Sequence, residues 1–127
     1  MPAYTVDGFD NLIAGMVQPI VTQSVIITSG APAVLQRGAV LARTGFAADG
    51  TWQCVIVNSG AAGAPDKVPV AVLADAEVDA RTVSVRATAY VQGEFNRAAL
   101  TFGGTDTIAT HEAALNAAKI YTKRVVG

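Results

Sequence analysis

The sequence predicts a mainly β domain with one or two short helices near its C-terminus. Strand-like segments follow one another at short spacing and are separated by turn dipeptides such as Asp49-Gly50 and Ser59-Gly60. The apolar content comes from 24 Ala and 17 Val with only eight aromatic residues, a composition typical of strands and tight turns. Helix signals appear only after residue 95. The predicted central strands are residues 39–43, 51–57, 68–74 and 82–91.

Chain length and rare residues limit the possible classes of protein. A chain of 127 residues has the size of one domain and buries roughly two-thirds of its surface, which allows a hydrophobic core without disulfides. Cys54 is the only cysteine and His111 the only histidine. The sequence therefore excludes an internal disulfide framework, a cysteine-rich zinc site and a metal site built on a histidine pair.

Individual strands follow from alternation of apolar and polar side chains. Residues 21–28 alternate with one exception, Ile26, and Asp49-Gly50 predicts a tight hairpin turn between two strands. Residues 82–90 alternate clearly, so one face of this strand is predicted to be buried and the other to face solvent. The predicted buried face carries Val83, Val85, Ala87 and Ala89.

The first twenty residues are predicted to form a flexible arm, followed by one domain over residues 21–127. The arm mixes Gly8, Gly15 and Pro19 with single apolar residues and shows no sustained period of 2 or 3.6. So short a stretch has little neighbouring chain to cover its apolar groups, and such terminal segments stay mobile until a partner covers them.

Two helical segments and a last strand are predicted near the C-terminus. Asn96 is a suitable N-cap for a short turn over residues 97–100, and Thr110 or Asp106 for a longer helix that ends near Lys119. Residues 120–126 are predicted to form the final strand.

Charge and hydropathy argue against nucleic acid and membrane as partners. Nine Lys and Arg against ten Asp and Glu give a net charge of −1, whereas phosphate binding needs a concentrated basic face. Residues 11–36 contain no charge, but polar residues and prolines interrupt them throughout, and no run reaches membrane-spanning length. The start lacks the basic residues of a secretory signal, so synthesis in the cytoplasm is expected.

No set of side chains in the sequence has the pattern of a catalytic or metal centre. Asp75, Glu77 and Asp79 alternate and could hold a hard cation, but they lack the glycine and further acidic ligand of a calcium loop, and a solvated turn explains them better. His111 has no Gly-x-Ser-x-Gly partner, and Cys54 fits a buried strand. We therefore expect binding without catalytic residues, metal or cofactor.

The order of motifs in residues 31–126 resembles the head decoration proteins of tailed bacteriophages related to lambda. Residues 68–74 read Val-Pro-Val-Ala-Val-Leu-Ala, and Glu-Val-Asp follows at 77–79. Residues 35–41, Leu-Gln-Arg-Gly-Ala-Val-Leu, are similar to the start of the family's ordered domain. The sharpest element is the pattern Gly-x-Phe-x-x-x-x-Leu, here Gly93, Phe95 and Leu100. The arm is outside the resemblance.

The resemblance implies a fold of the β-clip type, a bent ribbon or incomplete barrel. It also implies a homotrimer that binds the major capsid protein on the outside of an expanded phage head, at three-fold positions. Proteins of this family brace the shell against packaged DNA, and a flexible N-terminal arm orders against it. The expected location is the virion surface.

We expect the arm and the strand at residues 21–28 to make the shell contact. An added strand supplies backbone hydrogen bonds together with apolar burial. The candidate contact residues are Phe9, Leu12, Ile13, Met16, Val17, Val21, Val25 and Ile27. Two alternatives remain open: a small nucleotide hydrolase on a β-clip frame, and a module that binds host sugars.

Overall fold

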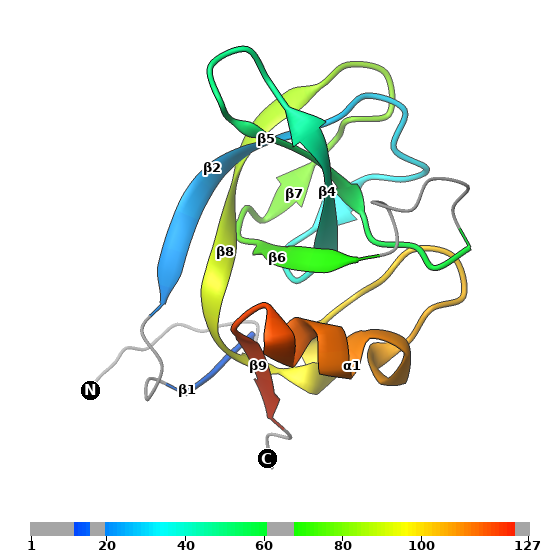
Figure 1. Ribbon diagram of the computed structural model, residues 1–127. Helices are drawn as coiled ribbons and strands as arrows, with labels where there is room; N and C mark the ends of the chain where they lie inside the picture. Colours follow the sequence, from blue (N-terminus) through cyan, green and yellow to red (C-terminus); the bar gives the residue numbers. More distant parts are fainter. Residues whose placement is uncertain (1–11, 16–19, 61–67, 124–127) are drawn as a thin grey trace.

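The computed structural model of the chain describes residues 12–15, 20–60 and 68–123. Its centre is a partial barrel in which β8 pairs with β2, β2 with β5, β5 with β4, β4 with β6, and β6 again with β8 (Figure 1). The barrel strands are β2 (Val21–Ile27), β4 (Val40–Phe46), β5 (Trp52–Ile56), β6 (Pro69–Leu73) and β8 (Val85–Asn96). The predicted mainly β fold is confirmed.

The long strand β8 belongs to two sheets, which gives the ribbon its bend. Its residues 85–92 pair with β2 inside the barrel. Beyond them it pairs with β1 (Ile13–Gly15) on one side and with β9 (Ile120–Lys123) on the other. The first and last strands therefore lie at the same end of the molecule (Figure 1). A separate two-stranded sheet joins β3 (Leu35–Gln36) to β7 (Glu77–Val78).

Two apolar clusters hold this arrangement together. One gathers around the side chains that point into the barrel, among them Val25, Ile27, Leu41, Cys54, Leu73 and Ala89. The other lies between the outer barrel face and the C-terminal elements, among them Leu12, Val40, Val72, Phe95, Leu115 and Ile120. Alternation along each strand sends neighbouring residues into different clusters, so small β-branched residues can serve both.

Two short helices lie after β8, as the sequence predicts. The 3₁₀ helix η2 (Arg97–Ala99) begins at Asn96, whose side chain accepts a hydrogen bond from the Ala98 N–H at 3.1 Å. The helix α1 (Ile108–Ala117) begins after Thr107, so both suggested caps for it were wrong by a few residues. Thr110 instead lies inside the first turn, where its hydroxyl accepts from the Thr107 N–H.

Strand boundaries differ from the predictions where the chain turns. β8 starts at Val85, and Val83 lies in the preceding loop with 61% of its surface exposed, so its assignment to the buried face was wrong. The Asp49-Gly50 hairpin is confirmed: β4 and β5 pair antiparallel across it, and the Asp49 carboxylate accepts from the Thr51 N–H at 3.0 Å. β2 matches its predicted range, and β9 the part of its range that is described.

Candidate binding surface

The candidate contact residues fall into three groups in the structure. Phe9, Met16 and Val17 lie outside the described residues. Ile13 is half-buried beside the second apolar cluster, and Val21 is exposed over 42% of its surface at the start of β2. Of the described candidates, Val21 offers the most apolar side-chain surface to a partner.

Leu12, Val25 and Ile27 lie in the chain's own core, and their role in shell contact stays a prediction. These side chains are at most 1% exposed and pack inside the chain's own two clusters. Leu12 is held from both sides, because its carbonyl also accepts the Asn96 N–H at 2.7 Å. The alternation in the sequence was right, but it turns the apolar face of β2 into its own barrel. Within the predicted arm, residues 13–15 form β1, which pairs with β8.

Among the described residues, one edge of β2 is unpaired at the start of the strand. Its residues pair with β8 over the whole length, whereas β5 pairs only with Val25, Ile26 and Ile27. Within the described residues, positions 21–24 therefore have one neighbouring strand. Val21 pairs with Gln92, directly before β8 enters the sheet of β1 and β9. An open edge of this kind can accept an added strand.

The three pattern residues Gly93, Phe95 and Leu100 meet at the junction of the two sheets. Phe95 is fully buried, and its ring lies 5.5 Å from that of Tyr90. Gly93 has φ of +154°, and a Cβ there would stand 3.1 Å from Phe95 Cζ. Leu100 is 7% exposed in the same cluster. The pattern therefore specifies how β8 bends over its own phenylalanine, which is a structural role.

A polar cluster joins the loop after β5 to α1, with the His111 and Asp106 side chains buried and Ser59 exposed. The Asp106 carboxylate accepts hydrogen bonds from the Ser59 hydroxyl at 2.5 Å and from the Ser59 N–H at 2.6 Å, and His111 Nε2 lies 2.7 Å from it. The Ser59 hydrogen bonds, aided by His111, lower the pKa of Asp106 to about 2. Because the serine hydroxyl faces the carboxylate and not the imidazole, the order of contacts is not that of a catalytic triad. Phe102 stacks on His111 and completes the cluster.

Acid should weaken this cluster. A carboxyl whose pKa is lower in the folded state contributes stability above its unfolded pKa and loses it as the pH falls through the folded pKa. We expect part of the stability to be lost between about pH 4 and pH 2, and the Asp106→Asn variant to show a smaller loss there. Urea unfolding of both proteins across this range measures the difference.

Asp79→Asn is the matched control for the acid experiment. The pKa of Asp79 is also lowered to about 2, by hydrogen bonds from Arg81, but both side chains are more than half exposed. Exposed ion pairs contribute little to stability. At pH 7 the midpoint should therefore fall further for Asp106→Asn than for Asp79→Asn, and equal midpoints would contradict a structural role of the polar cluster.

The other chemical candidates are accounted for by structural contacts. Asp75 accepts from the Thr88 N–H, and Asp79 pairs with Arg81, so these two carboxylates do not converge. Among the described residues no group of three or more His, Cys, Asp or Glu could hold a metal ion. Cys54 is fully buried, and burial raises the pKa of its thiol to about 11 although the charge of Arg43 opposes this. The helices of the described part are too short to cross a membrane.

The described part is a bent β domain whose polar groups serve the fold and whose β2 edge is unpaired at residues 21–24. A family model, that of the bacteriophage lambda head decoration protein D, matches residues 9–121. The chain belongs to this family of phage head decoration proteins, as the resemblance implied. No curated protein matches it. Family membership gives a capsid-decorating role and a location on the virion head, in a family of structural proteins.

Proposed function

We propose that three copies of this protein bind the outside of an expanded phage head at its three-fold positions and stabilise the shell against packaged DNA. The protein is made in the host cytoplasm, and its partners are the major capsid protein and its own copies. Family membership supports attachment to the head. The open edge of β2 at residues 21–24 carries the proposal for how the chain attaches.

The edge of β2 lies where an added strand can reach it. It begins next to Gln92, at the end of the barrel from which β1 and β9 extend (Figure 1). Exposed Val21 would supply apolar burial, and the backbone of residues 21–24 the hydrogen bonds. Residues 1–11, which contain Phe9, would add contact area to the same shell subunit.

Several copies are needed for firm attachment. Ordering about ten residues of an arm costs on the order of 10–20 kcal/mol of backbone entropy. Roughly 400–800 Å² of apolar burial would offset this cost at about 25 cal/mol per Å². A single arm therefore binds marginally. Three arms on one trimer reinforce one another, because each later contact forms at high effective concentration.

Removal of residues 1–11 should weaken binding to empty expanded heads by at least about tenfold, since each trimer loses three contacts. The truncation stops before Leu12 because that side chain is 1% exposed in the second cluster, and its loss would damage the fold. Co-sedimentation with heads measures binding, and the melting temperature should stay unchanged. Full binding by the truncated chain would remove the arm from the proposal.

Val21→Lys should weaken binding by a similar factor, because a lysine on a strand edge opposes further strand pairing. Val83→Lys is the matched control: Val83 is also an exposed valine, but it lies in the loop before β8. We expect near-normal binding for the control in the same assay. Equal binding by the two variants would show that the β2 edge is not used.

A further inference from the structure

The hairpin of β4 and β5 projects from the barrel and carries an exposed aromatic ring near its tip. Phe46 ends β4, and 60% of its surface is exposed. The guanidinium of Arg43 lies 5.1 Å from the centre of this ring and 4.8 Å from that of Trp52. These contacts hold the ring in place while one side of it remains available. Exposed aromatic side chains with a fixed conformation are typical anchors of protein interfaces.

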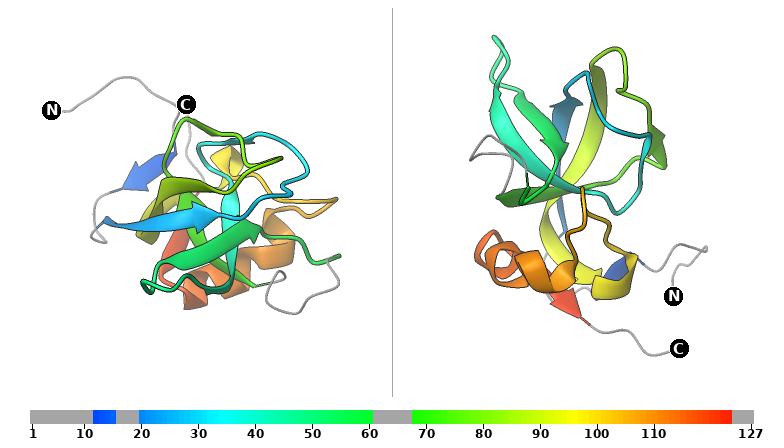
Figure 2. Two further views of the ribbon diagram at one scale, coloured as in Figure 1. Left: turned by 90° about the horizontal axis from the view of Figure 1, so that it is seen from above. Right: turned by 90° about the vertical axis from the view of Figure 1, so that its right-hand side faces the viewer.

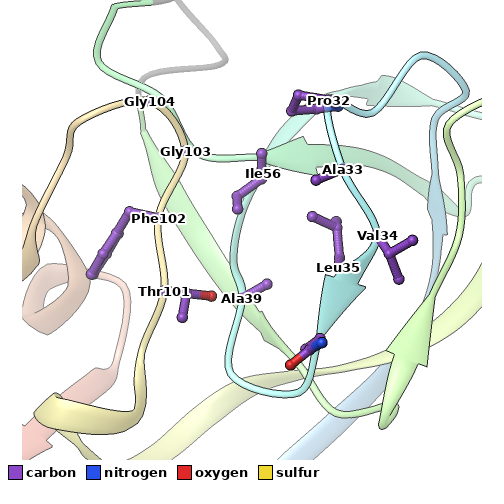
Figure 3. Close-up of a pocket in the computed structure, with 11 residues that line it drawn as sticks. Pro32, Ala33, Val34, Leu35, Ala39, Ile56, Thr101, Phe102, Gly103 and Gly104 are labelled. Atoms are coloured by element: carbon purple, nitrogen blue, oxygen red, sulfur yellow. The ribbon is translucent and has the colours of Figure 1, made fainter.

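An apolar groove of about 390 Å³ lies on another side of the same chain. One wall comes from residues 32–36, before and within β3, and the other from residues 101–104 between η2 and α1 (Figure 3). Leu35 and Ala39 are buried beneath it. Its apolar lining includes Pro32, Ala33, Leu35, Ala39, Ile56 and Phe102. The described residues that line the groove carry no charge, so the groove suits an apolar side chain of a partner.

The hairpin and the groove are separated on the surface. In the right-hand view of Figure 2 the segments of residues 32–36 and 101–104 run through the middle of the molecule, whereas the β4–β5 hairpin projects at the top. A closed ring of three subunits requires a heterologous contact, in which two different patches of each chain meet on neighbouring copies. A protruding ring and an apolar groove on one chain meet this requirement.

We propose that Phe46 of one copy inserts into the groove of the next and so closes the trimer; this inference rests on the proposed function. Charge complementarity supports a second copy as the occupant. Arg43, against the Phe46 ring, makes no ion pair within the described residues. Glu77, exposed on β7 beside the groove residue Gln36, likewise makes none there. Insertion of Phe46 brings the Arg43 guanidinium of one copy towards the Glu77 carboxylate of the next.

The other exposed apolar side chains fit the role less well. Val83 lies in a loop near Asp79 and Arg81, whose charges already neutralise each other through a two-fold hydrogen-bonded pair at 2.9 Å. Val21 belongs to the open edge of β2. Among the described residues, the exposed large apolar side chains are Val21, Phe46, Val68 and Val83. Phe46 is the aromatic one of these four.

The mass of the protein in solution tests the contact. Light scattering of the full chain should give the mass of three copies. Phe46→Ser should shift it to one copy, with the midpoint of association raised at least about tenfold in concentration. Val83→Ser, which changes an equally exposed residue, should leave the mass at three copies. Circular dichroism of both variants confirms that each one folds.

Cysteine cross-linking tests the pairing of the two patches. An Ala48→Cys chain, which keeps Phe46 and carries the cysteine at an exposed position of the same hairpin, is mixed with an Ala33→Cys chain under mild oxidation, while Cys54 remains fully buried and unreactive. The heterologous contact predicts a disulfide-linked species in the mixture and none in either chain alone. A mixture of Val83→Cys with Ala33→Cys should give none. Cross-links in the Ala48→Cys chain alone would indicate a two-fold contact and overturn the inference.

The remaining outcomes separate this inference from the proposed function. A Phe46→Ser chain that still has the mass of three copies overturns the inference and leaves the trimer intact. A wild-type chain that is single in solution, and whose cysteine variants also fail to cross-link when bound to heads, overturns it too. Attachment to the head is measured separately with the wild-type chain. This measurement tests the proposed function independently of the hairpin contact.

Discussion

Replacement of Gly38 by alanine is expected to lower the free energy of unfolding by about 3–6 kcal/mol. Gly38 has φ of +101°, and a Cβ built there overlaps the carbonyl oxygen of Ala99. The backbone cannot move away easily: its N–H donates to the Leu73 carbonyl, and its carbonyl accepts from the Thr101 N–H, both at 3.0 Å. Gly38 therefore holds the turn after β3 against both the barrel and the segment after η2.

Gly30→Ala separates the steric part of this effect from backbone strain. Gly30 has a similar φ of +94°, but no atom lies within 4 Å of a Cβ built there. Its replacement should cost only the strain of a left-handed conformation, about 1–2 kcal/mol. Urea unfolding of both variants at one protein concentration measures the difference. Similar losses would mean that the turn relaxes and that Ala99 does not constrain it.

The sequence predicts the fold class because its strands follow local rules. Alternation in residues 21–28 and the Asp49-Gly50 turn depend on neighbours in the chain, and the structure confirms β2 and the hairpin there. The two-residue strands β3 and β7 were missed because they are too short to alternate. They exist through a long-range pairing of Leu35 with Val78 that leaves no local signal.

Alternation predicts which residues share an apolar face, but it does not say whether the same chain or a partner covers that face. Val25 and Ile27 lie on an apolar face that a partner could have covered. In the structure the barrel cluster of the same chain covers them, and β2 pairs with β8. Leu12 lies in a stretch without any period, yet the second cluster buries it. Such burial depends on residues more than 80 positions away, such as Phe95. The groove was missed for the same reason, since its walls come from distant segments.

Phe95→Ala is expected to lower the free energy of unfolding by about 3–5 kcal/mol, the range for removing a buried phenylalanine. Phe95 is fully buried beneath the junction of the two sheets, where its backbone pairs with Ile13 in β1 and with Thr122 in β9. The cavity should loosen both flanking strands, so amide exchange should increase most in β1 and β9. Phe95→Leu retains most of the apolar volume and should cost only about 1–2 kcal/mol.

A double-mutant cycle connects this phenylalanine to Gly93. A Cβ at Gly93 would press on the Phe95 ring at 3.1 Å, so Gly93→Ala should destabilise the wild-type chain through both contact and strain. In the Phe95→Ala background the contact is gone and only the strain at φ of +154° remains. The cost of Gly93→Ala should therefore be smaller there, with a coupling of about 0.5–3 kcal/mol. Strictly additive costs would mean that Gly93 serves the backbone bend alone and that the ring does not constrain it.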